Sequence, residues 1–521
     1  MSKNVEIYDT TLRDGSQSEG VAFSVEDKLA IAEILDGLGF HYIEGGNPAS
    51  NQKDREFFAR AAKMNLKNAV LTAFGSTRRK DIKAADDANV KALIASGAKV
   101  ACIFGKSSVL HVEQILQTTK EENINMIFDT VTALKQAGMR VFFDAEHYFD
   151  GFLLDSEYAL SSLDAAQRAG AQRLILCDTN GGMTMEGIRD IFRQSARRFP
   201  GAVFGIHCHD DSGLGVANSV ICVEEGAKQV QGTFLGIGER CGNANLSTIV
   251  PDLQVKMGYD CVSEEALANF TYAARAIAEI SNMRLGNMPY VGKSAFSHKA
   301  GMHADGVLKN ETSFEHVPPS TVGNERRFLL SEQMGRASLL KRIQLIAPKV
   351  DKDSPELKNL LSVIKEKEAN GFHYEAADSS FELLVRKALG MYRPFFDVVS
   401  YKILDEDKSA TGYTATAVVK VMVESTLTVA AAEGEGPVHA LDLALGNALE
   451  KAYPVLSEVH LTDYKVRVMD SGSATAAVVR VLVTTSDSKK SWTTVGAAAD
   501  IIKASFLALA DAIDYKLMNN E

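Results

Sequence analysis

The chain has 521 residues, of which 46% are hydrophobic and 24% are charged, a composition typical of a soluble globular protein with two or three domains. Its net charge of −11 argues against nucleic acid as a general partner. No apolar run approaches the roughly 18 residues of a membrane span, and the N-terminal "MSKNVEIYDTTLRDG" lacks the pattern of a secretory signal. The six cysteines show no CxxC spacing and suit free thiols, so we expect a cytoplasmic protein that binds no membrane.

Short apolar runs alternate with amphipathic segments from residue 5 to about residue 237. Two of these segments, 24–39 with Ser24 as its cap and 126–138, are predicted helices that end at glycine. About eight strand–helix repeats in roughly 280 residues predict an α/β fold, a (β/α)₈ TIM barrel. An open doubly wound sheet is less favoured, because no GxGxxG follows the first strand. The predicted strands are 5–9, 41–46, 69–75, 99–105, 140–148, 173–179, 202–209 and 229–238.

Polar and ionisable side chains recur where the predicted strands end. In a barrel of this kind the C-terminal ends of all strands meet on one rim, and the chemistry is found there. We therefore expect residues that are far apart in the sequence to converge at that rim. They are Arg13, Asp14, Glu44, Gly75, Glu146, Thr179, His207, His209 and Asn243.

The stretch "VFGIHCHDDSGLG", residues 203–215, carries two histidines at the end of a predicted strand. Because side chains alternate along a strand, His207 and His209 share a face and Cys208 points away from them. With the Asp14 carboxylate they would give two nitrogen ligands and one oxygen ligand, a set that suits Mg²⁺, Mn²⁺ or Zn²⁺. The alternative is that each histidine is simply hydrogen-bonded on its own.

Arg13 precedes the candidate ligand Asp14 in "DTTLRDGSQ". A bound divalent ion would polarise a substrate carbonyl, and the Arg13 guanidinium would neutralise the charge that grows on its oxygen. A solvated turn pair is the alternative interpretation of these two residues.

The last part of the chain contains an internal repeat. The alternating segment 418–423 recurs as 478–483, and the amphipathic segment 438–449 recurs as 501–513, in the same order. Two copies of a strand-plus-helix unit predict a pseudo-symmetric α+β domain, although two unrelated amphipathic pieces could coincide by chance.

These patterns predict three domains. Residues 1–285 would form the catalytic barrel, and 286–395 a linker region that is loop-rich at first and helical from residue 336. Residues 396–521 would form the α+β domain, to which the family resemblance of this chain assigns a regulatory and dimerisation role.

Several motifs resemble those of the isopropylmalate/homocitrate/citramalate synthase family. They are "LRDGSQ" with Lys28 eleven residues after Gln17, "HCHDDSGLGVANS", "CDTNGG", "GERCGNANL" and the C-terminal duplication. Members of this family are metal-dependent barrel enzymes that condense acetyl-CoA with a 2-oxo acid. Segments 43–58 and 322–340 are most similar to the citramalate branch.

The resemblance implies a metal site and a substrate site in the barrel. Asp14, His207 and His209 would bind a divalent metal, with Asn243 as a fourth ligand or in the surrounding shell. Arg13 and Thr179 would hold the 2-oxo acid, and Glu146 would help to position the reacting groups.

The resemblance also implies a catalytic base in "HKAGMHADG". From the residues alone His298 and His303 are both candidates, and the family pattern favours His303, assisted by Asp305. In relatives this histidine reaches the barrel of the other subunit, which implies a homodimer. Phe314 stands where the family often has tyrosine, so a phenol hydroxyl is absent here.

The function implied by this resemblance is condensation of acetyl-CoA with pyruvate followed by thioester hydrolysis, for isoleucine biosynthesis, with isoleucine as effector. An isopropylmalate synthase that uses 2-oxoisovalerate and responds to leucine is the near alternative. A lyase of the hydroxymethylglutaryl-CoA type is disfavoured by about 230 residues beyond the barrel, and a non-enzymatic sensor by the intact ligand set.

Overall fold

The computed structural model contains two compact units, Met1–Phe296 with Val317–Arg326, and Ser297–His316 with Arg327–Glu521. In the described part of the chain, no helix is both long and apolar enough to cross a membrane. The described residues are 3–298, 301–328, 336–351, 354–374, 376–408, 412–469, 477–487 and 490–520.

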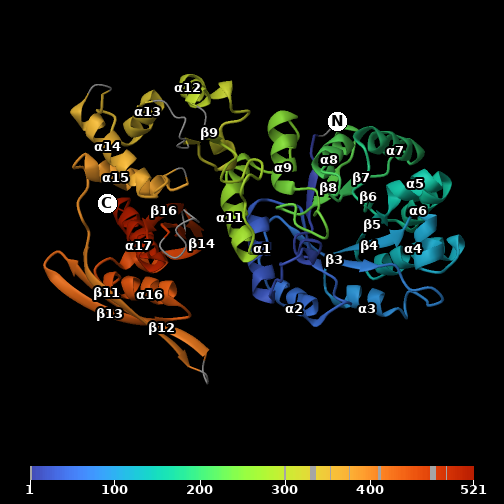
Figure 1. The fold of residues 1–521 in the computed structure, drawn as a ribbon. Helices are drawn as coiled ribbons and strands as arrows, with labels where there is room; N and C mark the ends of the chain where they lie inside the picture. Colours follow the sequence, from blue (N-terminus) through green and yellow to red (C-terminus); the bar gives the residue numbers. More distant parts are fainter. Residues whose placement is uncertain are drawn as a thin grey trace. The chain divides into compact units, whose positions relative to one another are not determined.

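The first unit is the expected barrel (Figure 1). Its eight strands are hydrogen-bonded in chain order, every neighbouring pair is parallel, and β8 pairs with β1 to close the cylinder. The strands are β1 (Glu6–Asp9), β2 (Tyr42–Gly46), β3 (Val70–Ser76), β4 (Val100–Lys106), β5 (Arg140–Glu146), β6 (Arg173–Asp178), β7 (Phe204–Cys208) and β8 (Gln229–Gly232).

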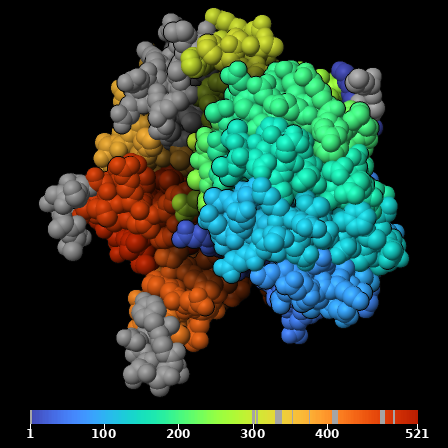
Figure 2. All heavy atoms as spheres, turned by 90° about the vertical axis from the view of Figure 1, so that its right-hand side faces the viewer, coloured from blue at the N-terminus to red at the C-terminus, as the bar shows by residue number. Residues whose placement is uncertain are grey.

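Helices surround these strands (Figure 1), and Figure 2 shows the face of the molecule that the cyan and green part of the chain, which includes α4 to α7, presents to the viewer. The predicted cap at Ser24 is confirmed: its side chain accepts from the Asp27 N–H, and Asp27 accepts from the Ser24 N–H in return. The helices of this unit are α1 (Val25–Gly37), α2 (Gln52–Ala61), α3 (Ala88–Ala95), α4 (Lys120–Gln136), α5 (Tyr148–Leu154), α6 (Ser156–Ala169), α7 (Met185–Arg198), α8 (Gly215–Glu224), α9 (Leu246–Pro251), α10 (Glu264–Leu267) and α11 (Phe270–Ile280).

A layer of aromatic rings fills part of the barrel interior. Tyr42 and Phe142 meet edge to face with ring centroids 5.0 Å apart, and Tyr8 lies 5.9 Å from Tyr42. Val100 and Cys102 complete this buried cluster. The cylinder is therefore a packed core rather than a pore, as the fold requires.

Several predicted boundaries are wrong by two residues or more, among them the start of β7 at Phe204 rather than 202 and the ends of α1 and α4 at Gly37 and Gln136 rather than 39 and 138. The strand expected to run to residue 238 ends at Gly232, because Thr233 bridges to Asn245 instead of continuing the ladder. The strand expected to run to residue 148 ends at Glu146, because His147 adopts a left-handed conformation (φ 57°) before α5. The helix expected from residue 126 begins at Lys120, in a polar first turn that carries no apolar periodicity.

The second unit begins with the two-stranded pair β9 (Ser297–His298) and β10 (Arg327–Phe328), between which lies α12 (Gly301–Lys309). The helical character expected from residue 336 is confirmed by α13 (Arg336–Ile346), α14 (Pro355–Ala369) and α15 (Asp378–Ala388), which share one apolar cluster.

The expected C-terminal repeat is present and is larger than a strand plus a helix (Figure 1). Each copy is a three-stranded antiparallel sheet followed by a helix. In both copies a glycine, Gly434 or Gly496, lets the backbone approach the fourth residue of that helix, and an added Cβ would lie within 2.5 Å of it. The copies are β11 (Asp397–Lys408), β12 (Gly412–Val423), β13 (Thr426–Gly434), α16 (Pro437–Leu449) and β14 (His460–Val468), β15 (Val479–Ser486), β16 (Ser491–Ala498), α17 (Ile501–Met518).

Candidate functional site

A tight turn after β1 places Arg13 and Asp14 at the C-terminal end of the barrel. The N–H groups of Arg13 and Gly15 both donate to the Thr10 carbonyl, at 3.0 and 3.2 Å. Gly15 lets this turn pack closely on Ile237, because a Cβ there would lie 2.9 Å from the end of the Ile237 side chain, which would have to shift. The sequence "LRDG" thus fixes both side chains on the rim.

The Arg13 guanidinium is held from three directions. Its Nε donates to Glu44 Oε1 at 2.5 Å, its Nη1 pairs with Asp14, and its Cζ lies over the Phe74 ring, 3.6 Å from the ring centroid. Tyr8 in turn donates to Glu44 Oε2 at 2.5 Å. A guanidinium fixed in this way can present its remaining N–H groups to an anionic oxygen without reorganising.

The two histidines and Asp14 lie together on this rim, as the sequence predicts. His207 Nε2 is 3.4 Å from Asp14 Oδ2, and the ring centroids of His207 and His209 are 5.4 Å apart. Asn243 is brought to them by an antiparallel bridge with His209. Residues that are more than 200 positions apart in the sequence therefore share one site.

The donor atoms of this cluster fit a divalent cation. Among the described residues, Asp14 Oδ2, His209 Nδ1 and Asn243 Oδ1 are buried atoms without a hydrogen-bond partner, although buried polar atoms are nearly always satisfied. Asn243 Nδ2 donates to the Ile237 carbonyl at 3.3 Å, so its oxygen is the free end of the amide. Within the described ranges no three His, Cys, Asp or Glu side chains form a ready-made metal cluster. The rim cluster differs from such a group, because one of its four donors is the amide oxygen of Asn243 and because its carboxylate, Asp14, pairs with Arg13.

The electrostatics of the cluster favour metal ligation. Burial raises the pKa of Asp14, but Arg13 and the two histidines outweigh it and hold that pKa below its usual range. Burial, together with His207, lowers the pKa of His209 to about 4. Near neutral pH the site therefore offers a carboxylate and a neutral imidazole with a lone pair.

Glu146 and Thr179 lie at the ends of β5 and β6, and their contacts run to neighbouring rim residues. Glu146 pairs with Lys106 on the adjacent strand. The Thr179 hydroxyl accepts from the His147 N–H at 2.8 Å, and its carbonyl accepts from Arg240 at 2.9 Å. The roles expected for Glu146 and Thr179 stay predictions.

The residues expected around the catalytic base belong to the second unit. The His303 ring is stacked on Phe314, with centroids 4.2 Å apart and planes at 24°. His298 donates to or accepts from Glu315 at 2.9 Å and is buried, whereas His303 is exposed. Asp305 falls in α12, and its side chain lies outside the described residues. The role expected for His303 stays a prediction.

Sequence reasoning missed the polar residues inside the barrel. Gln231 contacts His207, and Asp144 contacts Gln231, yet neither stood out because neither closes a strand. The period-two alternation was the available signal: it places Asp144 on the same face as Glu146 and Gln231 on the same face as Gln229.

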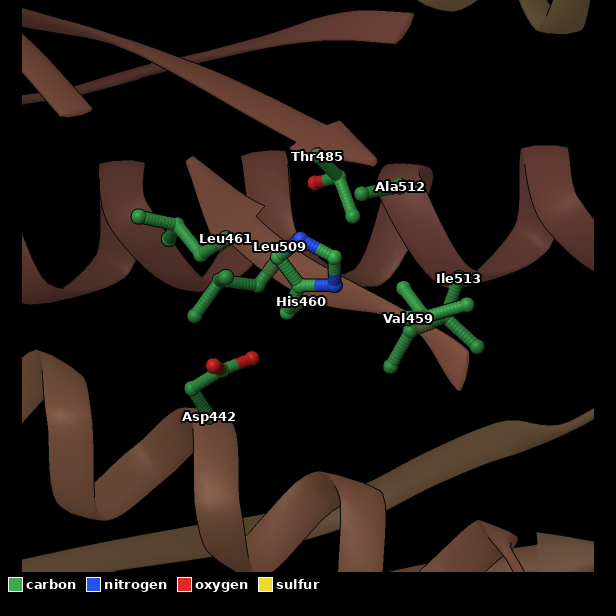
Figure 3. Close-up of a pocket in the computed structure, with 8 residues that line it drawn as sticks. All are labelled: Asp442, Val459, His460, Leu461, Thr485, Leu509, Ala512 and Ile513. Carbon is green, nitrogen blue, oxygen red and sulfur yellow. The ribbon is translucent and has the colours of Figure 1, made fainter. Parts of the chain in front are cut away.

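A small cavity of about 30 Å³ lies in the C-terminal repeat. Figure 3 shows the Asp442 side chain pointing from α16 toward His460 and Leu509. Burial raises the pKa of Asp442. The lining residues are Asp442, Val459, His460, Leu461, Thr485, Leu509, Ala512 and Ile513.

Three family models match successive parts of the chain. The chain belongs to the HMGL-like family, which matches residues 4–283. A homocitrate synthase post-HMGL domain-like region matches 290–371, and a LeuA allosteric (dimerisation) domain matches 375–517.

Relatives that match nearly the whole chain include (R)-citramalate synthases and a 2-isopropylmalate synthase. An (R)-citramalate synthase of Aquifex aeolicus is 50% identical over 100% of this chain and 99% of the relative. An (R)-citramalate synthase of Synechocystis is 45% identical over 98% of this chain and 96% of the relative. A 2-isopropylmalate synthase of Methanocaldococcus jannaschii is 31% identical over 99% of this chain and 95% of the relative.

Proposed function

We propose that this protein is an (R)-citramalate synthase, which condenses acetyl-CoA with pyruvate and then hydrolyses the thioester. The observation that carries the proposal is the rim cluster of Asp14, His207, His209 and Asn243 beside a fixed Arg13. Full-length likeness to (R)-citramalate synthases at 41–50% identity supports the choice of substrate.

The four residues of the rim cluster would hold a divalent ion, Mg²⁺, Mn²⁺ or Zn²⁺. When bound, such an ion polarises a ketone and its neighbouring carboxylate. Arg13 stabilises the negative charge on the ketone oxygen as the new carbon–carbon bond forms, because its guanidinium is already oriented by Glu44 and Phe74.

The remaining steps are assigned to residues at the rim of one subunit and in α12 of the other subunit of a homodimer. Thr179 donates its hydroxyl to the substrate carboxylate, and Glu146 orients the groups around it. His303, assisted by Asp305, removes a proton from the acetyl methyl group, a task for which an imidazole is suited. Phe314 stacks on His303 and limits the orientations of its ring.

The substrate assignment is tested by measuring CoA release with pyruvate and with 2-oxoisovalerate at saturating acetyl-CoA. We expect kcat/KM for pyruvate to exceed that for 2-oxoisovalerate by at least tenfold. If 2-oxoisovalerate is the better acceptor, the protein is a 2-isopropylmalate synthase. Turnover that survives exhaustive chelation of divalent metal would contradict the role of the rim cluster.

We also propose that isoleucine binds in the cavity of the C-terminal repeat. Asp442 would pair with its ammonium group, His460 and Thr485 would contact its carboxylate, and Leu509 and Ile513 would receive its side chain. Because a cavity of about 30 Å³ holds little more than one water, binding must move these side chains apart, which gives the effector different affinities for two conformations.

The effector proposal is tested by titrating activity with isoleucine and leucine. Isoleucine should inhibit at lower concentration than leucine, and Asp442→Asn should raise its half-inhibitory concentration at least tenfold. Glu450→Gln, an exposed change at the end of the same helix, is the control. If isoleucine has the same half-inhibitory concentration for Asp442→Asn as for Glu450→Gln, Asp442 is not part of the effector site.

The match to a dimerisation domain supports a homodimer. The face of the first C-terminal sheet that points away from α16 exposes apolar side chains such as Leu427 and Val429, at 52% and 54%. Light scattering after size exclusion should give twice the chain mass of 56.4 kDa, and Val429→Lys should lower it toward the mass of one chain.

A further inference from the structure

The two ring nitrogens of His207 face different side chains, Asp14 and Gln231. Nε2 faces Asp14 Oδ2 at 3.4 Å, and Nδ1 lies 3.0 Å from the side-chain oxygen of Gln231. An imidazole nitrogen binds a metal only through its lone pair, so the proton must reside on the other nitrogen. Whether Nδ1 carries that proton depends on which end of the Gln231 amide faces it.

The Gln231 amide is fixed from its other end. Gln231 Nε2 donates to Asp144 Oδ1 at 3.2 Å, and the Cys102 thiol donates to the same oxygen at 3.0 Å. Asp144 Oδ1 therefore acts as an acceptor for two donors. Turning the amide over would set the Gln231 carbonyl oxygen against this acceptor, and two acceptors cannot hydrogen-bond to each other.

The orientation of the Gln231 amide determines the tautomer of His207. Asp144 selects the Nε2 end of the Gln231 amide, so the Gln231 oxygen faces His207. An oxygen in that place accepts from Nδ1–H, and this leaves the lone pair of His207 on Nε2, toward Asp14. We propose that Gln231, oriented by Asp144, is a positioning residue that holds His207 in the tautomer that can bind metal. This inference rests on the metal site of the proposed function.

The location of these groups argues against a purely structural role. Gln231 is fully buried and Asp144 is 3% exposed, inside a barrel whose interior positions normally carry branched apolar side chains. Burying polar groups there is unfavourable unless each is hydrogen-bonded. Gln229, two residues earlier on β8, is equally buried. It donates to Glu6 at 3.1 Å and accepts from Gln231 Nε2 only at 3.5 Å, so it serves as a comparison for burial without a contact to His207.

The experiment compares Mn²⁺ affinity, measured by electron paramagnetic resonance of the free ion, in the full chain and five variants, of which His207→Ala removes a ligand. Gln231→Met should weaken Mn²⁺ binding about 10- to 100-fold, and Asp144→Ala should act in the same direction. Asp144→Asn should stay within about threefold of the parent, because its carbonyl oxygen can still accept from both Gln231 and Cys102. Gln229→Met should also stay within about threefold, since its amide does not reach His207 and the contact that it loses to Gln231 Nε2, at 3.5 Å, is longer than the 3.2 Å bond from that atom to Asp144.

A second readout reports the tautomer directly. In the metal-free protein labelled with ¹⁵N-histidine, the His207 signals, identified by their loss in His207→Ala, should show a protonated Nδ1. In Asp144→Ala a protonated Nε2 should become populated, and this variant keeps the test available if Gln231→Met does not fold.

The outcomes separate this inference from the proposed function. If His207→Ala loses Mn²⁺ while Gln231→Met keeps it, the positioning role is wrong and the metal site stands. If Gln229→Met weakens Mn²⁺ as much as Gln231→Met, the effect belongs to interior packing and the positioning role is again overturned. If His207→Ala keeps the affinity of the parent, the metal site itself is wrong.

Discussion

Replacing Arg13 by lysine tests how much of the chemistry depends on a fixed guanidinium. Arg13 donates through Nε to Glu44 at 2.5 Å and through Nη1 to Asp14 while stacking on Phe74. A lysine ammonium can keep one of these ion pairs but has neither the planar fork nor the stack. A lost charge-assisted hydrogen bond costs about 2 kcal/mol of stability. Loss of an oriented donor to the substrate oxygen costs about 3 kcal/mol in the transition state, or about a hundredfold in kcat.

The assay is CoA release from acetyl-CoA with pyruvate, and Arg173→Lys is the matched control. Arg173 also forms a two-point ion pair with a glutamate, Glu6, at 2.7 and 2.9 Å, and also approaches an aromatic ring, but it begins β6 at the opposite end of the strands. Both variants should lose stability in urea, and only Arg13→Lys should lose kcat. Retention of kcat within threefold in Arg13→Lys would refute the role assigned to the guanidinium.

Three further predictions concern single side chains. Burial raises the pKa of Asp178 to about 6, so the folded state favours its protonated carboxyl over its carboxylate. The stability that the protonated carboxyl contributes is therefore lost as pH rises from about 4 to about 6. The stability of the parent relative to Asp178→Asn, from urea unfolding, should therefore drop by up to about 3 kcal/mol between pH 4 and pH 7, and a pH-independent difference would contradict this. Phe314→Ala removes the ring stacked on His303 and should lower kcat about fivefold with an unchanged KM for pyruvate; an unchanged kcat would show that the stack is dispensable. Ser24→Ala removes the capping box of α1 and should lower the free energy of unfolding by about 1 kcal/mol, whereas Ser18→Ala, outside any helix, should have no effect on it.

The strand–helix alternation was sufficient to predict the barrel, because period-two and period-3.6 patterns alternate clearly from residue 5 onward. The errors fall where the pattern carries no such signal. Lys120 opens α4 with an exposed polar turn, and Thr233 leaves the ladder of β8 through a bridge that depends on Asn245, twelve residues away.

The candidate site was predictable in its ligands but not in their supports. His207 and His209 could be placed on one face from their spacing, and Asp14 from its position after the first strand. The ion pair of Arg13 with Glu44 could not be foreseen, because it joins two strand ends whose spacing only the closed barrel fixes. Gln231 was also missed, since a glutamine inside a strand gives no pattern until its neighbours are known.

The most direct measurement counts tightly bound Mn²⁺ ions per chain, by equilibrium dialysis, in the parent and in Asp14→Asn. The parent should bind one ion per chain, and the variant should bind it at least a hundredfold more weakly while keeping its fold by circular dichroism. A variant that binds Mn²⁺ as tightly as the parent would contradict the assignment of the barrel rim as the metal site.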